Sequence, residues 1–211
     1  MKLLYLSRVR LNVKKRDTQL AFASPNRFHG AVERCFLNRN ERKLWRVDKL
    51  GENYYLLILS PEKPCLSNIK RECGYIDDAD EIKCYDNFLQ SVQEGSVWQF
   101  RLAANPTRSI DDGDKKRGKV VAHVSEKYQM EWLKEKALKN GFTVLTDGSC
   151  VVESEWKTFY KNDNGSRVRL KETVFQGILR VDDVKLFQNA LVNGIGRGKA
   201  YGMGLITIMR A

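Results

Sequence analysis

Residues 97–103 read VWQFRLA, and in this stretch Trp98, Phe100 and Leu102 alternate with the polar side chains Gln99 and Arg101. Strict alternation of apolar and polar side chains is typical of a strand with one buried face. A similar series of patterns precedes this strand and follows it. We therefore expect it to begin the second copy of one folding motif.

The residues before this strand predict the order strand, helix, strand, strand, helix, strand. Ser24 is a suitable N-cap, Pro25 suits the first helical turn, and apolar side chains from Phe28 to Phe36 share one helical face. The polar residues 12–19 are expected to connect the first strand to this helix. The predicted strands cover residues 3–11, 44–47, 54–59 and 82–85, and the second helix lies near residues 66–73.

The residues after 103 repeat this order. A basic loop over 105–119 precedes a helix over 125–138, in which Tyr128, Trp132 and Leu138 are expected to face the core. Strands are predicted at 142–145, 150–160, 168–181 and 205–209, with a turn at 162–165 and a helix at 184–192. The order βαββαβ is that of a ferredoxin-like domain. The predicted fold class is therefore α+β, with two tandem ferredoxin-like (RRM-like) domains over residues 1–90 and 96–211.

The composition favours a soluble protein with a polyanionic partner. The 211 residues include 37 Lys and Arg against 26 Asp and Glu, which gives a net charge of +11. Nucleic acid is the first candidate partner and an anionic membrane surface the second, because each neutralised phosphate releases condensed counterions. The longest apolar runs are shorter than the ~20 residues of a membrane span, and Arg8 and Arg10 interrupt any signal-peptide core. We expect a cytoplasmic protein that does not bind membranes.

The cysteines give no sign of a metal site. The five are Cys35, Cys65, Cys73, Cys84 and Cys150, and they form no CxxC pair. A structural zinc site takes four Cys or His ligands, usually in close pairs, and the chain has only two histidines, His29 and His123. We therefore expect reduced thiols, no bound metal and no cofactor.

Residues 194–204 read GIGRGKAYGMG, with five glycines in eleven positions. The spacing matches neither a phosphate-binding P-loop nor a dinucleotide-binding fingerprint. The backbone amides of such a turn can approach a phosphate closely, with Arg197 and Lys199 supplying positive charge. A tight connection from helix to strand that needs positive φ values would explain the glycines equally well.

The glycine-rich segment resembles the C-terminal loop of the RAMP superfamily of CRISPR RNA-processing proteins. Residues 100–107, FRLAANPT, are similar to a segment of its CasE-type members, and residues 3–9 and 175–179 also fit. The resemblance therefore covers the whole chain. It implies a CRISPR repeat endoribonuclease with two ferredoxin-like domains that cuts precursor CRISPR RNA at the 3′ base of the repeat hairpin without a metal. Its implied partners are the repeat RNA, which stays bound, and the other subunits of the type I-E surveillance complex; alone it would be a monomer.

The family's catalytic histidine lies early in the first helix, where His29 is the only candidate in this chain. An imidazole can accept the proton of the RNA 2′-OH or donate one to the leaving 5′-oxygen, because its pKa lies near neutral pH. Attack by the 2′-OH leaves a 2′,3′-cyclic phosphate. Glu33, one helical turn on, could orient or charge the ring. A lone histidine at the border of an apolar helix face is, in the ordinary case, a packing residue.

The sequence departs from the family pattern at Asn26. Some members carry a tyrosine there, three residues before the histidine, and an amide can bind a phosphate oxygen but cannot perform a phenol's proton chemistry. Tyr5 and Tyr201 are candidate substitutes, and Asn26 and Lys199 are candidates to support catalysis. We expect the second histidine, His123, to have a structural or RNA-proximal role.

Further basic and polar residues are expected to contact the RNA. Arg27, Arg34 and Asn38 share one side of the first helix, where a solvated polar face is the ordinary alternative. The resemblance places a basic hairpin against the repeat's stem, whose deep, narrow major groove favours phosphate contacts. The expected RNA-binding set is Arg27, Arg34, Asn38, Arg101, Arg108, Lys157, Lys161, Arg167, Arg169, Lys171, Gly196, Arg197, Gly198 and Lys199, which Lys115, Lys116 and Arg117 would extend.

Two alternatives remain open from the sequence. The chain could be a non-catalytic RNA-binding RAMP subunit of a CRISPR effector complex. The absence of the tyrosine at position 26 is consistent with that hypothesis. It could also be a basic two-domain protein unrelated to CRISPR, such as a ribosome-associated factor. Cleavage of a repeat hairpin separates the first alternative from an endoribonuclease, and preference for that hairpin separates the second.

Overall fold

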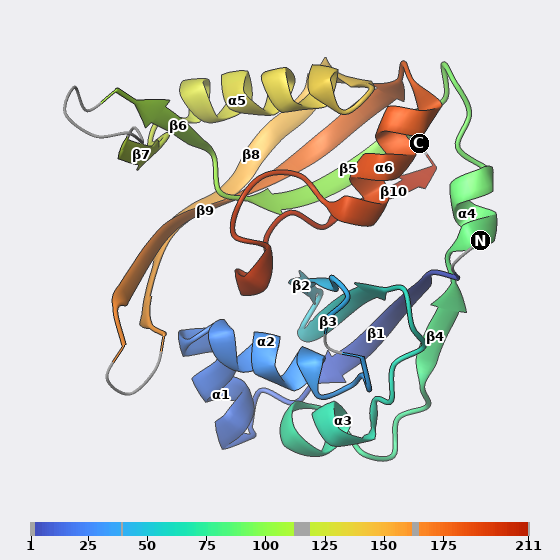
Figure 1. Cartoon of the computed structure of the whole chain (residues 1–211), viewed down its shortest axis with the longest axis vertical. Coiled ribbons are helices and arrows are strands. Elements are labelled where there is room, and N and C mark those ends of the chain that lie inside the picture. Colours follow the sequence, from blue (N-terminus) through green and yellow to red (C-terminus); the bar gives the residue numbers. More distant parts are fainter. Residues whose placement is uncertain (1–2, 39, 112–118, 162–164, 211) are drawn as a thin grey trace.

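The computed structural model describes residues 3–38, 40–111, 119–161 and 165–210. Two four-stranded antiparallel sheets lie one above the other in Figure 1, with helices on their outer sides. The predicted α+β fold of two ferredoxin-like units is confirmed, because both sheets have the strand order that this fold requires. The domain limits of 1–90 and 96–211 stay a prediction. The expected turn at 162–164 and the basic residues 115–117 lie outside the described residues.

The first sheet has the order β2-β3-β1-β4, and all its pairs are antiparallel. Its elements are β1 (Tyr5–Leu11), α1 (Arg16–Ala23), α2 (Asn26–Glu33), β2 (Leu44–Leu50), β3 (Asn53–Ser60), α3 (Ser67–Cys73) and β4 (Glu81–Cys84). The interpretation of residues 12–19 as a plain connection was wrong, because α1 begins at Arg16. Its buried contacts are few: Thr18 donates a hydrogen bond of 2.9 Å from its hydroxyl to the carbonyl of Cys73, and Ala21 is buried.

The second sheet has the order β10-β5-β9-β8, which repeats the first sheet element for element. After α4 (Asp86–Gln90) come β5 (Val97–Ala104), β6 (Thr107–Ile110), β7 (Lys119–Ala122), α5 (Glu126–Lys139), β8 (Phe142–Tyr160), β9 (Arg167–Val181), α6 (Val184–Asn193), the 3-10 turn η1 (Lys199–Tyr201) and β10 (Ile206–Arg210). Part of the predicted basic loop over 105–119 is thus a hairpin, in which β6 pairs with β7. Among the described residues no helix is long and apolar enough to cross a membrane.

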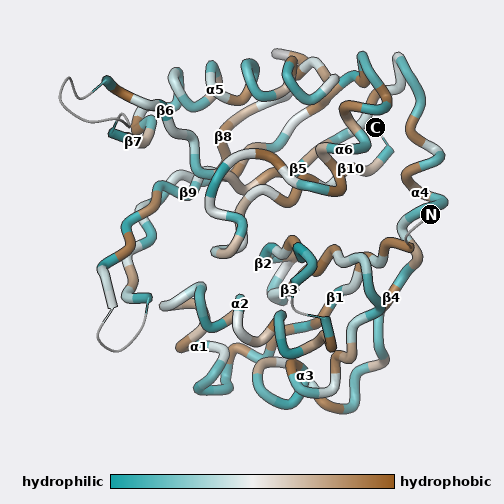
Figure 2. The backbone as a smooth tube through the Cα atoms, in the orientation of Figure 1, coloured by the Kyte–Doolittle hydropathy of each residue, from teal (hydrophilic) through white to brown (hydrophobic). Residues whose placement is uncertain are grey.

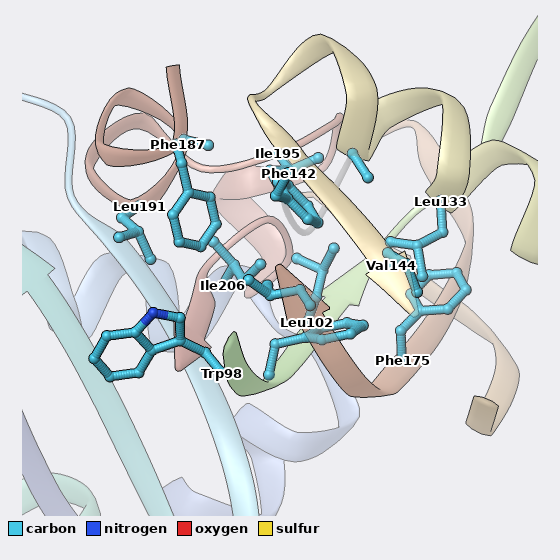
Figure 3. Packing of buried hydrophobic residues seen from close by; sticks show 14 of the residues in the cluster. Trp98, Leu102, Leu133, Phe142, Val144, Phe175, Phe187, Leu191, Ile195 and Ile206 are labelled. Carbon is cyan, nitrogen blue, oxygen red and sulfur yellow. The ribbon is translucent and has the colours of Figure 1, made fainter. Parts of the chain in front are cut away.

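Each sheet buries one face under its helices. Hydrophobic segments follow the strands of both sheets in Figure 2. Figure 3 shows the core of the second half, a single cluster that contains Leu102 and Phe175 of the sheet and Phe187 and Leu191 of α6. Trp132 of α5 is part of this core, as its spacing predicts. The same prediction was wrong for Tyr128 and Leu138, which are exposed on the outer side of α5.

A buried ionic cluster joins the two halves. Arg46 of β2 is 2% exposed and binds both carboxylate oxygens of Asp48, at 2.7 and 2.8 Å. Its guanidinium also donates to the carbonyls of Arg101 and Leu205 and to the hydroxyl of Thr207, all in the second half. Burying a charge is costly unless partners satisfy it. This arginine therefore fixes how β2 sits against β5 and β10.

Candidate active site

Helix α2 holds His29 at the edge of the first core. Phe28 and Val32 are buried, whereas His29, one residue after Phe28, is half-buried. At the start of the helix, the hydroxyl of Ser24 donates to Oδ1 of Asn26, and the carbonyl of Ser24 accepts from the backbone N–H of Arg27 at 2.9 Å. The imidazole therefore lies where the helical spacing predicts, on the border between packed core and open surface.

His29 opens onto a surface hollow of about 810 Å³ that both halves of the chain enclose. Glu33 comes from the same helix, and Lys199 and Ala200 come from η1 in the glycine-rich segment. The remaining lining residues are Asn40, Glu41, Arg42, Lys43 and Asn193. The structure thus brings together three predicted site residues that lie up to 170 positions apart in the chain (199 − 29).

One wall of the hollow is an ion pair between a buried lysine and a half-buried glutamate. The Nζ atom of Lys43, whose side chain is 1% exposed, lies 3.0 Å from a carboxylate oxygen of Glu33. The same ammonium donates to the carbonyl of Asn38 at 2.7 Å. Lys43 was missed in the sequence, where it appears only as one of several charges before the strand at 44–47. The carboxylate of Glu33 is therefore held by a buried cation.

Lys199 supplies a cation beside the imidazole. Partial burial lowers the pKa of its ammonium, and the positive charge of Arg42 lowers it further. Both effects disfavour the charged form. Lys199 therefore gives up its proton more readily than an ordinary lysine, and its protonated form can hold a phosphate.

The glycine-rich segment is fixed against the first half at Gly202. This residue has φ of 83°, and a Cβ atom built on it would lie 2.7 Å from the indole ring of Trp45. The backbone N–H of Gly204 bonds to the carbonyl of Ala103 at 2.6 Å, which ties the segment to β5. The need for positive φ and for close approach therefore accounts for a glycine here, and the same contacts place Lys199 over the hollow.

The basic hairpin formed by the far ends of β8 and β9 reaches across to α1 and α2 (Figure 1). There Nδ2 of Asn26 donates to the carbonyl of Lys161 at 3.1 Å. The rings of Phe159 and Tyr201 lie 4.9 Å apart between the hairpin and η1. Asn26 thus connects the first turn of the histidine's helix to the end of the hairpin, and its amide is not among the residues that line the hollow.

The predicted RNA-binding residues of the hairpin fall into two groups. Lys161, Arg167 and Arg169 are exposed, and Arg169 lies over the ring of Trp156 at 4.1 Å. Lys171 is 6% exposed, and Lys157 forms ion pairs with Glu155 and Glu172. The first three cations are the ones that a polyanion can reach.

The other predicted residues lie on or just after α2, between the sheets and at a separate hollow. Arg27 is exposed on the helix, and Arg34 at its C-terminal end pairs with Glu72 at 2.6 Å. Asn38 is exposed, but the prediction that it shares the helix face was wrong, because α2 ends at Glu33. Arg101 faces the first sheet and bonds to Asp48 at 3.1 Å. The separate hollow gathers Arg108, Gly196 and Arg197 together with Lys136, and Gly198 forms the N-terminal boundary of η1.

The described residues that line the hollow of His29 include none of the rival candidates for catalysis. His123 follows β7, and its ring packs against that of Tyr128 at 6.0 Å. Tyr5 lies in β1, and Tyr201 contacts the hairpin through Phe159. In the described part of the chain no cluster of three or more His, Cys, Asp or Glu side chains could hold a metal ion.

Comparison with known proteins identifies the family. A family model described as CRISPR associated protein matches residues 4–210, nearly the full chain. The chain belongs to this family. The predicted resemblance to CasE-type proteins is thereby confirmed, and the alternative of a basic protein unrelated to CRISPR was wrong.

Relatives within this family have similar chains. The CRISPR-associated endoribonuclease Cse3 of Thermus thermophilus is 26% identical over 219 residues, which cover 97% of this chain and 99% of Cse3. The CRISPR system Cascade subunit CasE of Escherichia coli is 29% identical over 124 residues, or 56% of this chain and 60% of CasE. The structure of Thermus thermophilus Cse3 bound to an RNA representing a pre-cleavage complex matches with a TM-score of 0.82 at 22% identity, covering 98% of this chain and 99% of the other. This likeness shows the shared fold.

Proposed function

We propose that this protein is an endoribonuclease that binds the CRISPR repeat stem-loop and cuts precursor CRISPR RNA at the 3′ base of the hairpin. The observation that carries this proposal is the hollow that His29 lines together with Lys199 of the glycine-rich segment. The relatives support it, since Cse3 is named an endoribonuclease and matches the chain from end to end.

The proposed chemistry uses the RNA's own 2′-OH as nucleophile and needs no metal. In-line attack on the neighbouring phosphorus forms the new O–P bond, breaks the bond to the 5′-oxygen, and leaves a 2′,3′-cyclic phosphate. His29 takes the proton of the 2′-OH or gives one to the departing 5′-oxygen, which an imidazole can do at neutral pH. Lys199 stabilises the charge that develops on the phosphate oxygens.

The proposed RNA surface combines the exposed cations of the hairpin with exposed residues on and after α2. Lys161, Arg167 and Arg169 contact phosphates of the stem, and Arg27 and Asn38 extend this contact toward the hollow. Asn26 maintains the distance between hairpin and His29, because it bonds the hairpin's backbone to the first turn of α2. Arg34, Lys157, Lys171 and Arg101 have partners within the chain and contribute by holding this surface in shape.

We further propose that the protein acts in the cytoplasm as a subunit of a type I-E surveillance complex. CasE is named a Cascade subunit, which supports this partnership. The cut RNA stays bound when the protein joins the other subunits, and the free protein is a monomer.

The experiment is cleavage of a labelled repeat RNA in EDTA, beside the same RNA with a 2′-deoxy nucleotide at the cut site. Cutting of the first RNA alone, with a cyclic phosphate on the 5′ product, is the expected result. Tight binding of both RNAs without cutting would instead identify a non-catalytic RNA-binding subunit. Loss of cutting in EDTA that Mg²⁺ restores would contradict the metal-independent mechanism.

A further inference from the structure

A second, smaller hollow of about 160 Å³ lies between the β6–β7 hairpin, α5 and the glycine-rich segment. Its walls are Thr107, Arg108, Ser109 and Val120 from the hairpin, Trp132 and Lys136 from α5, and Gly196 and Arg197 from the segment. Figure 1 shows this hairpin beside α5, on the side of the second half that also carries the long β8–β9 hairpin. The hollow is separate from the one that contains His29, with which it shares no lining residue.

The backbone around this hollow is closely fitted. Gly196 has φ of 81°, and a Cβ atom there would lie 3.1 Å from the ring of Trp132, so the segment packs against α5 without room for a side chain. An isolated bridge between Asn105 and Arg197 ties the same segment to the end of β5. The ammonium of Lys136 lies 5.9 Å from the centre of the Trp132 ring. These contacts hold the backbone at Arg197 and the side chain of Lys136 at the opening, which Arg108 also lines.

The charged side chains that line this hollow are all positive. Arg108, Lys136 and Arg197 line it together with the hydroxyl residues Thr107 and Ser109, and its described lining includes no carboxylate. Within the part of the chain that the structure describes, none of the three cations forms an ion pair, whereas Arg8, Arg10 and Arg34 elsewhere all do. Three neighbouring cations without acidic partners repel one another, and an anion that enters between them relieves this repulsion. A phosphate group has the charge and the acceptor oxygens that these side chains can bind.

The glycine-rich segment connects this hollow to the one that contains His29. Gly196 and Arg197 line the smaller hollow, and Lys199 and Ala200 line the larger one. The Cα atoms of Arg197 and Lys199 are two residues apart and so at most about 7 Å from each other. An extended nucleic-acid strand with a phosphate at Lys199 can therefore place a nearby phosphate among Arg108, Lys136 and Arg197. The hollow of about 160 Å³ has room for a phosphate group but not for a folded stem, and whether that phosphate belongs to the flank or to the stem is what the test below distinguishes.

We infer that the hollow of Arg108, Lys136 and Arg197 binds a backbone phosphate of the single-stranded RNA that adjoins the cut site. This inference rests on the proposed function and adds a position for the flanking strand to it. The hollow contacts the backbone and not the bases, because its lining offers charge and hydroxyls around a single phosphate-sized space. It therefore fixes the position of the strand relative to the cut site whatever the base sequence of the flank.

The test compares Lys136→Gln with Lys134→Gln in the full chain. Both lysines are on α5 and two residues apart, so they face opposite sides, and Lys134 is exposed outside the hollow. Affinity is measured against salt for two RNAs, a repeat stem-loop with its single-stranded flanks and the stem-loop without them. For the flanked RNA, Lys136→Gln is expected to weaken binding about tenfold and to reduce the salt slope by about 0.7, the value for one phosphate contact of a single strand. Lys136→Gln is expected to bind the RNA without flanks as tightly as the wild type does. Lys134→Gln is expected to bind both RNAs with wild-type affinity and salt slope.

Two results would overturn the inference. Equal loss of affinity for both RNAs would show that Lys136 contacts the stem, and no loss for either would show that the hollow holds no RNA. The second variant, Arg108→Gln, removes a cation from the β6–β7 hairpin and leaves α5 unchanged. It must also weaken binding of the flanked RNA and not of the RNA without flanks. Failure of the proposed endonuclease would appear separately, as flanked RNA that the wild-type protein binds but does not cut.

Discussion

At the scale of single residues, the account depends on what Asn26 does in place of a tyrosine. Its Nδ2 atom donates to the carbonyl of Lys161, and its Oδ1 atom accepts from Ser24. Both polar atoms of the amide thus have partners: Nδ2 joins α2 to the hairpin, and Oδ1 bonds to the residue that precedes the helix start. The sequence shows the departure from the family pattern but does not show this contact, because it joins residues 135 positions apart.

Asn26→Asp removes the donor to Lys161 and leaves the side chain the same size. A hydrogen bond of this kind contributes about 0.5–1.5 kcal/mol, so we expect stem-loop affinity to fall by a factor of roughly 2 to 12. Filter binding with labelled RNA measures this change. Asn87→Asp, on the exposed side of α4, makes the same change of charge away from the hairpin and should bind as the wild type does. Equal weakening in both variants would show that added negative charge, not the lost contact, is the cause.

Lys199 gives a prediction about stability and pH. Burial and Arg42 lower its pKa in the folded protein, so the folded state binds this proton less well than the unfolded state does. Its charge therefore destabilises the fold below the lowered pKa, and this cost disappears as pH rises toward the ordinary value of 10.5. Urea unfolding of Lys199→Met should show greater stability than wild type at pH 7, with a difference that shrinks as the pH rises toward 10.5. A difference that grows with pH would contradict the lowered pKa.

At the scale of elements, the strong periodicity of apolar side chains was sufficient to predict most of the fold. The strand at 97–104 and the helix at 26–33 follow from alternation and from one apolar face. Helix α1 and the β6–β7 hairpin were missed, because each has few buried side chains and its stability comes from neighbours distant in sequence. The same limit applies to the site: His29 and Lys199 could be named from the sequence, but Lys43 and Lys136 acquire their positions only through packing.

The glycine-rich segment can be tested as an element through Gly202. Gly202→Ala places a Cβ 2.7 Å from the ring of Trp45, in addition to the strain of φ at 83°. Gly95→Ala is the matched control, because Gly95 has φ of 76° and nothing within 4 Å of an added Cβ. We expect about 1 kcal/mol of destabilisation for the control and about 1–3 kcal/mol more for Gly202→Ala, measured by urea unfolding. Equal losses of unfolding free energy in Gly202→Ala and Gly95→Ala would mean that the segment is not held against the first half.

At the scale of the whole molecule, Arg46 joins the two halves through a buried ionic cluster. Arg46→Met removes a donor to the carbonyls of Arg101 and Leu205 and a buried partner of Asp48. Breaking such a pair from one side costs about 3–5 kcal/mol. Arg8→Met breaks an exposed pair with Glu81 and should cost less than about 1 kcal/mol. The free energy of unfolding, measured for both variants, checks this prediction. If Arg46→Met lost as little stability as Arg8→Met, other contacts would be holding the two halves together.

The joint between the halves also matters for the proposed chemistry, because the hollow takes His29 from one half and Lys199 from the other. The most direct measurement is the single-turnover cleavage rate of repeat RNA by wild-type protein and His29→Ala, with the affinity of each measured in parallel. General acid–base catalysis contributes about 10²–10⁴ in rate. We predict that His29→Ala cuts at least about 100-fold more slowly while it binds the RNA within about twofold of wild type. A variant that cuts at the wild-type rate would show that His29 is only a packing residue of α2 and would contradict the account.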